Sequence, residues 1–105
     1  MGVLLSGCPS AIYMFTYTVP AKTERQGKKA VLPIVKRCES FADSLHINVS
    51  VDTWRVIDGM VTVRLIFNIK EPEDSILVKV PALFSFAISL KLNFINQFFY
   101  PKEGN

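Results

Sequence analysis

The sequence predicts an α+β domain in which an antiparallel β-sheet of four to five strands carries one helix packed on one face. Its 105 residues leave room for a single domain with one core. Half of the residues are hydrophobic and a fifth are charged, so the chain has enough apolar surface to fold, which excludes a disordered protein. One segment repeats apolar residues with the period of a helix, and others alternate apolar and polar residues as strands do. The expected order is β-α-β-β-β.

The first strand is expected at residues 11–19, after an apolar lead-in at residues 1–10. Aromatic and β-branched residues dominate this strand, and Pro20 ends the run. Residues 20–29 are polar and basic and contain Gly27, so they are expected to form a loop.

The helix is expected at residues 30–45, where one apolar stripe repeats at the i, i+3, i+4, i+7 spacing. Pro33 is tolerated in the first helical turn, where its nitrogen has no hydrogen bond to lose, so the helix should begin near residues 30–32. The stripe consists of Val31, Ile34, Val35, Cys38, Phe41, Ala42 and Leu45.

Residues 47–57 and 60–70 are expected to form a hairpin around Asp58-Gly59, a strong signal for a type I′ turn. That turn sets Val56 opposite Val61 and Trp54 opposite Val63. The apolar residues before position 52 have the opposite parity, so a one-residue bulge near Asp52-Thr53 is needed to bring all of them to one face.

Residues 76–98 are expected to be extended, as one long strand or two short ones bent near Pro81. Every even-numbered residue from Ile76 to Phe94 is apolar, which a strand would place on one side. The whole element order then resembles that of the cystatins. The glutamine-valine-glycine loop by which that family inhibits proteases is absent, since the hairpin turn reads Ile57-Asp58-Gly59-Met60. The resemblance therefore implies a fold and no inhibitory function.

Few residues suggest catalysis. His46 is the only histidine and falls at the end of the expected helix, where it is interpreted as a capping residue. Cys38 lies on the apolar stripe, more than two turns from His46, which argues against a cysteine–histidine pair. No metal-ligand spacing or glycine-rich phosphate loop occurs. The sequence predicts a protein that is not an enzyme and needs no cofactor or metal.

The face of the sheet opposite the helix is the expected binding surface. One helix covers about 10 Å of sheet width, and four or five strands at about 4.8 Å spacing are wider. The uncovered apolar strip on the helix side would need a neighbour, so we expect a homo-oligomer or a complex with another protein. The interface residues expected on the sheet face are Arg55, Arg64, Met60, Ile66, Lys79 and Lys91.

Nucleic acid is the alternative partner. The formal net charge is +3, and cations on the sheet face would be joined by the basic loop, where Lys22, Arg25, Lys28 and Lys29 could contact phosphates. By parity the aromatic residues fall on the helix side, away from these cations, which argues against base stacking.

The termini and cysteines bear on location. Gly2, Ser6 and Cys8 loosely match lipid-attachment patterns, although residues 1–7 are too short for a lipoprotein signal. Lys79 and Lys91 interrupt the apolar run 76–100, which argues against a membrane span. A buried, reduced Cys38 favours a reducing compartment, and a cytoplasmic location is expected.

Overall fold

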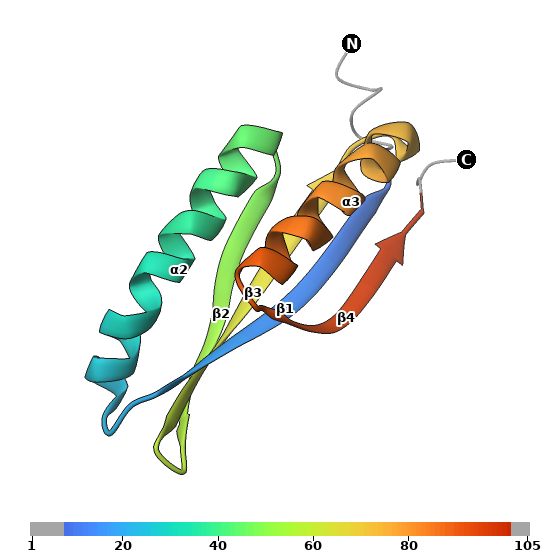
Figure 1. The fold of residues 1–105 in the computed structure, drawn as a ribbon. Helices are drawn as coiled ribbons and strands as arrows, with labels where there is room; N and C mark the ends of the chain where they lie inside the picture. Colours follow the sequence, from blue (N-terminus) through green and yellow to red (C-terminus); the bar gives the residue numbers. More distant parts are fainter. Residues whose placement is uncertain (1–7, 102–105) are drawn as a thin grey trace.

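The computed structural model describes residues 8–101, except for the side chains of Thr53 and Trp54. The lipid-attachment candidates Gly2 and Ser6 lie outside this range. Six elements follow one another (Figure 1): β1 (Ser10–Pro20), α2 (Glu24–Leu45), β2 (Asn48–Ile57), β3 (Met60–Lys70), α3 (Glu73–Ser89) and β4 (Asn93–Tyr100).

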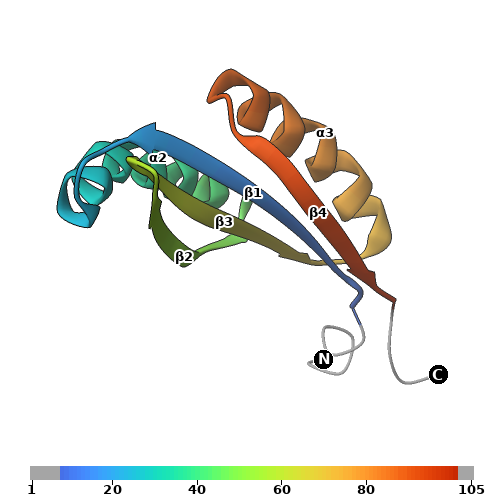
Figure 2. The same cartoon turned by 90° about the horizontal axis from the view of Figure 1, so that it is seen from below.

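The four strands form one antiparallel sheet in the order β2-β3-β1-β4. Both helices lie on the same side of it, and the opposite face is open (Figure 2). The fold class is therefore α+β, as expected. The βαββαβ order is that of a split βαβ, or ferredoxin-like, arrangement.

Helix α2 begins earlier than expected, at Glu24. Thr23 is the N-cap, and its Oγ1 accepts a hydrogen bond from the backbone N–H of Gln26 at 3.2 Å. The Gln26 side chain accepts one in return from the backbone N–H of Lys22 at 3.1 Å. This reciprocal pair resembles a capping box. Most of the expected basic loop is thus helical, and Pro33 lies inside the helix and not in its first turn.

Gly27 allows α2 to lie close to the sheet. A Cβ atom at this position would come within 2.2 Å of Cγ2 and 2.4 Å of Cβ of Val61 on β3. Val61 is fully buried. A glycine is therefore required at this crossing for steric reasons.

The hairpin has the expected register, with Val56 opposite Val61 and Trp54 opposite Val63. Asp58 and Gly59 have φ angles of 51° and 73°, the positive values that a type I′ turn requires. The register shifts between Val51 and Trp54, so the bulge lies where the parity conflict required one.

The expectation of extended structure is wrong for residues 76–89, which belong to helix α3. The alternation from Ile76 to Phe94 is not strict, because apolar residues also occupy odd positions, among them Leu77, Leu83 and Ala87. Ile76, Leu83 and Ala87 are the buried residues of α3, with the i, i+7, i+11 spacing of a helix face. Pro72 followed by two acids in the first turn is a helix-start signal, and it outweighs the apparent period of two. In the described chain after β3, only residues 93–100 are extended, as strand β4.

Helix α3 covers the part of the sheet that a single helix would leave bare. Its Phe86 ring stacks on Phe41 of α2, with ring centroids 4.1 Å apart. Its Phe84 ring packs edge-on against Tyr13 and Phe15 of β1. The uncovered strip inferred on the helix side is therefore absent from the described structure, and self-association needs another basis. Neither helix within residues 8–101 is long and apolar enough to cross a membrane.

Candidate interaction surface

Strand β4 leaves an uncharged, largely apolar edge of the sheet exposed. It is the outermost strand beside β1, at the right-hand edge in Figure 1, and all eight of its residues are exposed. Natural sheets protect such edges with charges or prolines, because their unpaired N–H and C=O groups readily pair with another chain. Residues 93–100 contain neither. The large exposed side chains are Phe94, Ile95, Phe98, Phe99 and Tyr100.

The pairing with β1 assigns each β4 side chain to a face of the sheet. Phe94 lies opposite the buried Phe15, and its ring packs against Phe15 and Phe84 at centroid distances of 5.6 and 5.3 Å. Gln97 and Phe99 share this helix-side face, because their partners Tyr13 and Ala11 do. The residues that face the open side are Asn93, Asn96, Phe98 and Tyr100.

Ile95 is an extra residue in the β4 strand. The register jumps from Phe15–Phe94 to Met14–Asn96, which leaves Ile95 without a partner on β1. The residue forms a β-bulge, and its side chain lines a hollow on the open face together with Thr16 and Arg64.

Helix α3 carries a second apolar stripe beside this edge. Leu77, Pro81 and Ile88 lie at i−7, i−3 and i+4 from Phe84, so they share the side of the helix that Phe84 turns toward β4. Leu77 is 66% exposed and Ile88 is 74% exposed. A helix with apolar residues on a second side is typically covered on that side as well.

We call the surface formed by Leu77, Ile88, Phe94, Ile95, Phe98, Phe99 and Tyr100 the α3–β4 side. Its seven side chains are between 40% and 74% exposed. With about 180 Å² of surface per large side chain, they expose on the order of 700 Å². A standard interface buries about 800 Å² per partner, so the α3–β4 side is large enough to form most of one.

The open face of the sheet holds four of the six residues expected at the interface. Met60, Arg64 and Ile66 occupy the β3 positions that alternate with the buried ones, and Arg55 lies opposite Thr62 on β2. Arg64 forms an ion pair with Asp52, which offsets part of the positive charge. A shallow hollow of about 220 Å³ is lined by Thr16, Arg55, Thr62, Arg64 and Ile95.

Lys79 and Lys91 do not lie on this face, contrary to the expectation. Lys79 belongs to α3, and its Nζ is 2.5 Å from a carboxylate oxygen of Glu71. Lys91 occupies the turn after α3 with a φ of 60°. The expectation placed both on the sheet because it took residues 76–98 as extended, whereas Lys79 is helical and Lys91 lies in a turn.

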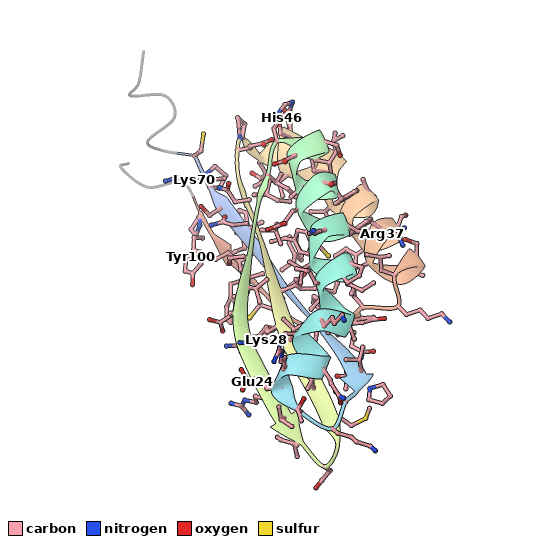
Figure 3. All side chains as sticks on the ribbon, turned by 90° about the vertical axis from the view of Figure 1, so that its left-hand side faces the viewer. Glu24, Lys28, Arg37, His46, Lys70 and Tyr100 are labelled. Carbon is pink, nitrogen blue, oxygen red and sulfur yellow. The ribbon has the colours of Figure 1, made fainter. Side chains whose placement is uncertain are left out.

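The basic residues expected in a loop at residues 20–29 lie instead at the N-terminal end of helix α2. Lys22, Arg25, Lys28 and Lys29 are exposed around the first turns of α2. Lys28 forms an ion pair with Glu24 at 2.9 Å, and Figure 3 shows both at the end of α2 opposite to His46. Cations near a helix N-terminus are unfavourably placed relative to the helix dipole.

The open face offers little for base stacking. Among the described residues of the two central strands, the large apolar side chains on this face are Ile12, Met14, Ile66 and Met60, none of them aromatic. The aromatic side chains on this face, Phe98 and Tyr100, belong to the outermost strand β4. Sheets that stack nucleobases place aromatic rings on the central strands beside cations.

The two residues considered for catalysis, Cys38 and His46, lie in the core and at a helix cap. Burial raises the pKa of the Cys38 thiol to about 12, so the thiol is protonated and a poor nucleophile at neutral pH. His46 is the C-cap of α2, with a left-handed backbone and a φ of 58°. Within residues 8–101, no three acidic, histidine or cysteine side chains are grouped as metal ligands would be.

Comparison of the chain with protein-family models, with curated proteins and with solved structures finds no match.

Proposed function

We propose that this protein is a non-enzymatic interaction module that associates with protein, in the first place with itself, through the α3–β4 side. The exposed edge strand β4 is the observation that supports it: eight exposed residues, none charged, at the end of a sheet. Such an edge is a template for pairing with another chain. The self-association expected from the sequence is retained, although its surface differs from the one expected there.

The apolar stripe on α3 gives the proposal independent support. Leu77 and Ile88 are more exposed than any of the large side chains on β4. Exposed apolar patches of several hundred Å² on a soluble domain typically mark interaction sites. The stripe and the strand edge are adjacent, so one partner can cover both.

Size-exclusion chromatography with light scattering tests this proposal. At micromolar concentration we expect the wild-type mass to be that of a dimer or larger. Ile88→Lys should shift it toward the monomer, because a charge in an apolar interface loses its hydration. Leu32→Lys is the matched control, since Leu32 is 48% exposed on α2, away from the α3–β4 side. A monomeric wild type, or equal masses for Ile88→Lys and wild type, would refute the proposal.

We further propose a cytoplasmic location. Cys38 is a free thiol that is buried among apolar residues. A reduced thiol suits a reducing compartment. Fusion to a fluorescent protein in the source cell tests the location, and a secreted or membrane-bound signal would contradict it.

Nucleic-acid binding is a second candidate, supported by Lys22, Arg25, Lys28 and Lys29 around the start of α2. Phosphate groups would offset the unfavourable placement of these cations. Four phosphate contacts predict an affinity that falls on the order of 10²-fold between 50 and 200 mM salt. A mobility-shift experiment with a fluorescent oligonucleotide at 50 mM salt tests nucleic-acid binding, and the absence of a shift would exclude this function.

A further inference from the structure

We infer that two copies of the chain pair their β4 strands antiparallel about a twofold axis at Gln97, so that one eight-stranded sheet runs through the dimer. The inference rests on the proposed self-association and specifies its geometry. It follows from the bulge in β4, the position of α3 and the contrast between the two sheet edges.

The bulge makes Gln97 the centre of the paired positions of β4. Without Ile95, the strand has seven paired positions on β1, and Gln97 is the middle one. An antiparallel copy centred on Gln97 sets Gln97 opposite its own equivalent. Phe94 then lies opposite Phe99 of the second copy, and both face the helix side. On the open face, Asn96 meets Phe98 and Asn93 meets Tyr100, so each of the seven residues has a partner on its own face, as an antiparallel ladder requires.

A register with no bulge would fail this condition. Centring the strands between Asn96 and Gln97 would set Asn96, on the open face, opposite Gln97, on the helix side. The register at Gln97 is therefore the one that overlaps the whole strand and keeps the faces matched. Opposed side chains in such a ladder are about 5 Å apart, close enough for the four phenylalanines to pack as two cross-strand pairs.

The position of α3 fits this arrangement. Phe84 contacts β1 through Phe15 and β4 through Phe94, so α3 lies above the gap between these strands. With strands about 4.8 Å apart, the α3 axis is about 5 Å from the twofold axis. The two α3 helices would be about 10 Å apart, at the upper end of the usual packing distance. The exposed Leu77, Pro81 and Ile88 occupy the side of α3 that faces the second copy.

The other edge of the sheet is unsuited to the same pairing. Strand β2 carries Asp52 and Arg55, both exposed, and a bulge at positions 52–53. Charges and bulges on an edge strand oppose edge-to-edge pairing. Strand β4, by contrast, has no charge to oppose in any register. The contrast favours one closed dimer over an open chain of copies.

A charge exchange at Gln97 tests the register. Gln97→Lys and Gln97→Glu each set two like charges opposite one another at the axis, so each variant alone should dimerise at least tenfold more weakly than wild type. An equimolar mixture of the two variants should recover a dimer, because the introduced ammonium of one copy then faces the introduced carboxylate of the other. Ser50→Lys and Ser50→Glu on β2 provide the matched control and should change nothing, singly or mixed. Circular dichroism melts of all variants show whether each is folded.

Spin labels on β2 give a second, independent measurement. In a continuous sheet the two β2 strands are seven spacings apart, roughly 34 Å. A label at Ser50→Cys, in a Cys8→Ser background with Cys38 buried, should therefore report a distance near or above 30 Å by electron–electron double resonance. Packing of the two open faces against each other would instead bring the labelled strands much closer, since sheets stack about 10 Å apart.

The outcomes separate this inference from the proposed function. If wild type dimerises but the Gln97 variants do so equally well, or the mixture fails to recover the dimer, the register is wrong and self-association stands. A short distance between the Ser50 labels overturns the continuous sheet in the same way. A monomeric wild type overturns both. The pairing is supported if each Gln97 variant alone dimerises weakly, the mixture recovers the dimer and the distance between the Ser50 labels is long.

Discussion

Gly27→Ala should destabilise the fold, although the same change inside most helices stabilises it. Alanine has the higher helix propensity, which alone would add about 1 kcal/mol. Here the new Cβ would lie 2.2, 2.4 and 2.7 Å from three atoms of Val61, all closer than van der Waals contact allows. The sign of the effect depends on whether Val61 can move.

Val61 has little freedom to move. It is fully buried, and its strand β3 is held on both sides, by Val19 of β1 and Val56 of β2. One of the close atoms is the Cβ of Val61, so a change of rotamer does not relieve the overlap. Overpacking of this kind costs about 1–3 kcal/mol or more. Because the overlap includes this Cβ atom, we place the cost at the upper end of that range, about 2–3 kcal/mol. After the propensity gain of about 1 kcal/mol, the net loss is about 1–2 kcal/mol, a fall in Tm of roughly 5–15 °C for a domain of this size.

Urea unfolding followed by circular dichroism measures this loss as a lower midpoint at an unchanged m-value. Ser40→Ala, at an exposed position of the same helix, is the control and should stay within about 0.5 kcal/mol of wild type. If Gly27→Ala is as stable as wild type or more stable, the close approach of α2 to β3 is wrong.

Three further predictions concern the core. Leu83→Ala should lower the free energy of unfolding, measured in urea, by about 2–5 kcal/mol, because Leu83 is fully buried on the inner face of α3. A loss below about 1 kcal/mol would mean that this face of α3 does not pack against the core. A double-mutant cycle of Phe41→Leu and Phe86→Leu should give a coupling of about 0.5–1.5 kcal/mol from the stacked rings, and additive losses would contradict the stack. Because burial raises the Cys38 pKa from 9.0 to about 12, the unfolded chain loses this proton first as pH rises. Stability should therefore fall above about pH 9 by up to about 1.4 kcal/mol per pH unit. Urea unfolding of wild type and Cys38→Ala at about pH 8 and about pH 10 should show the smaller loss in the variant; equal losses would refute the assignment.

The proposed dimer changes how the apolar excess of the sequence is understood. The chain has eight phenylalanines. Phe15 and Phe67 are buried in the core, whereas Phe94, Phe98 and Phe99 are exposed on β4. Several exposed aromatic residues on one edge strand promote aggregation of a monomer, but they stabilise an interface when a partner covers them. The same side chains therefore explain both the composition and the expected association.

Several elements could be predicted because their residues fit one period only. In β1 Thr16 and Thr18 alternate with larger apolar residues, and β-branched and aromatic residues dominate. In α2 the stripe from Val31 to Leu45 fits a helix alone. Asp58-Gly59 can adopt the two positive φ angles of a tight hairpin, which sets the register. That register then required the bulge near Asp52, because apolar residues of opposite parity cannot otherwise share a face. Each of these inferences uses interactions between residues close together in the chain.

Residues 76–89 had no such unique pattern, because apolar residues occupy nearly every position and satisfy the periods of both a strand and a helix. Packing against Phe41 of α2 and Phe15 of β1 decided in favour of α3. The strand order was also beyond local patterns, since it depends on hydrogen bonds between distant segments. That order places β4 at the edge and β1 inside, although both strands are rich in aromatic residues. The candidate surface exists because of this placement: local periodicity shows which side chains share a face, and only the folded sheet shows which strand lacks a neighbour.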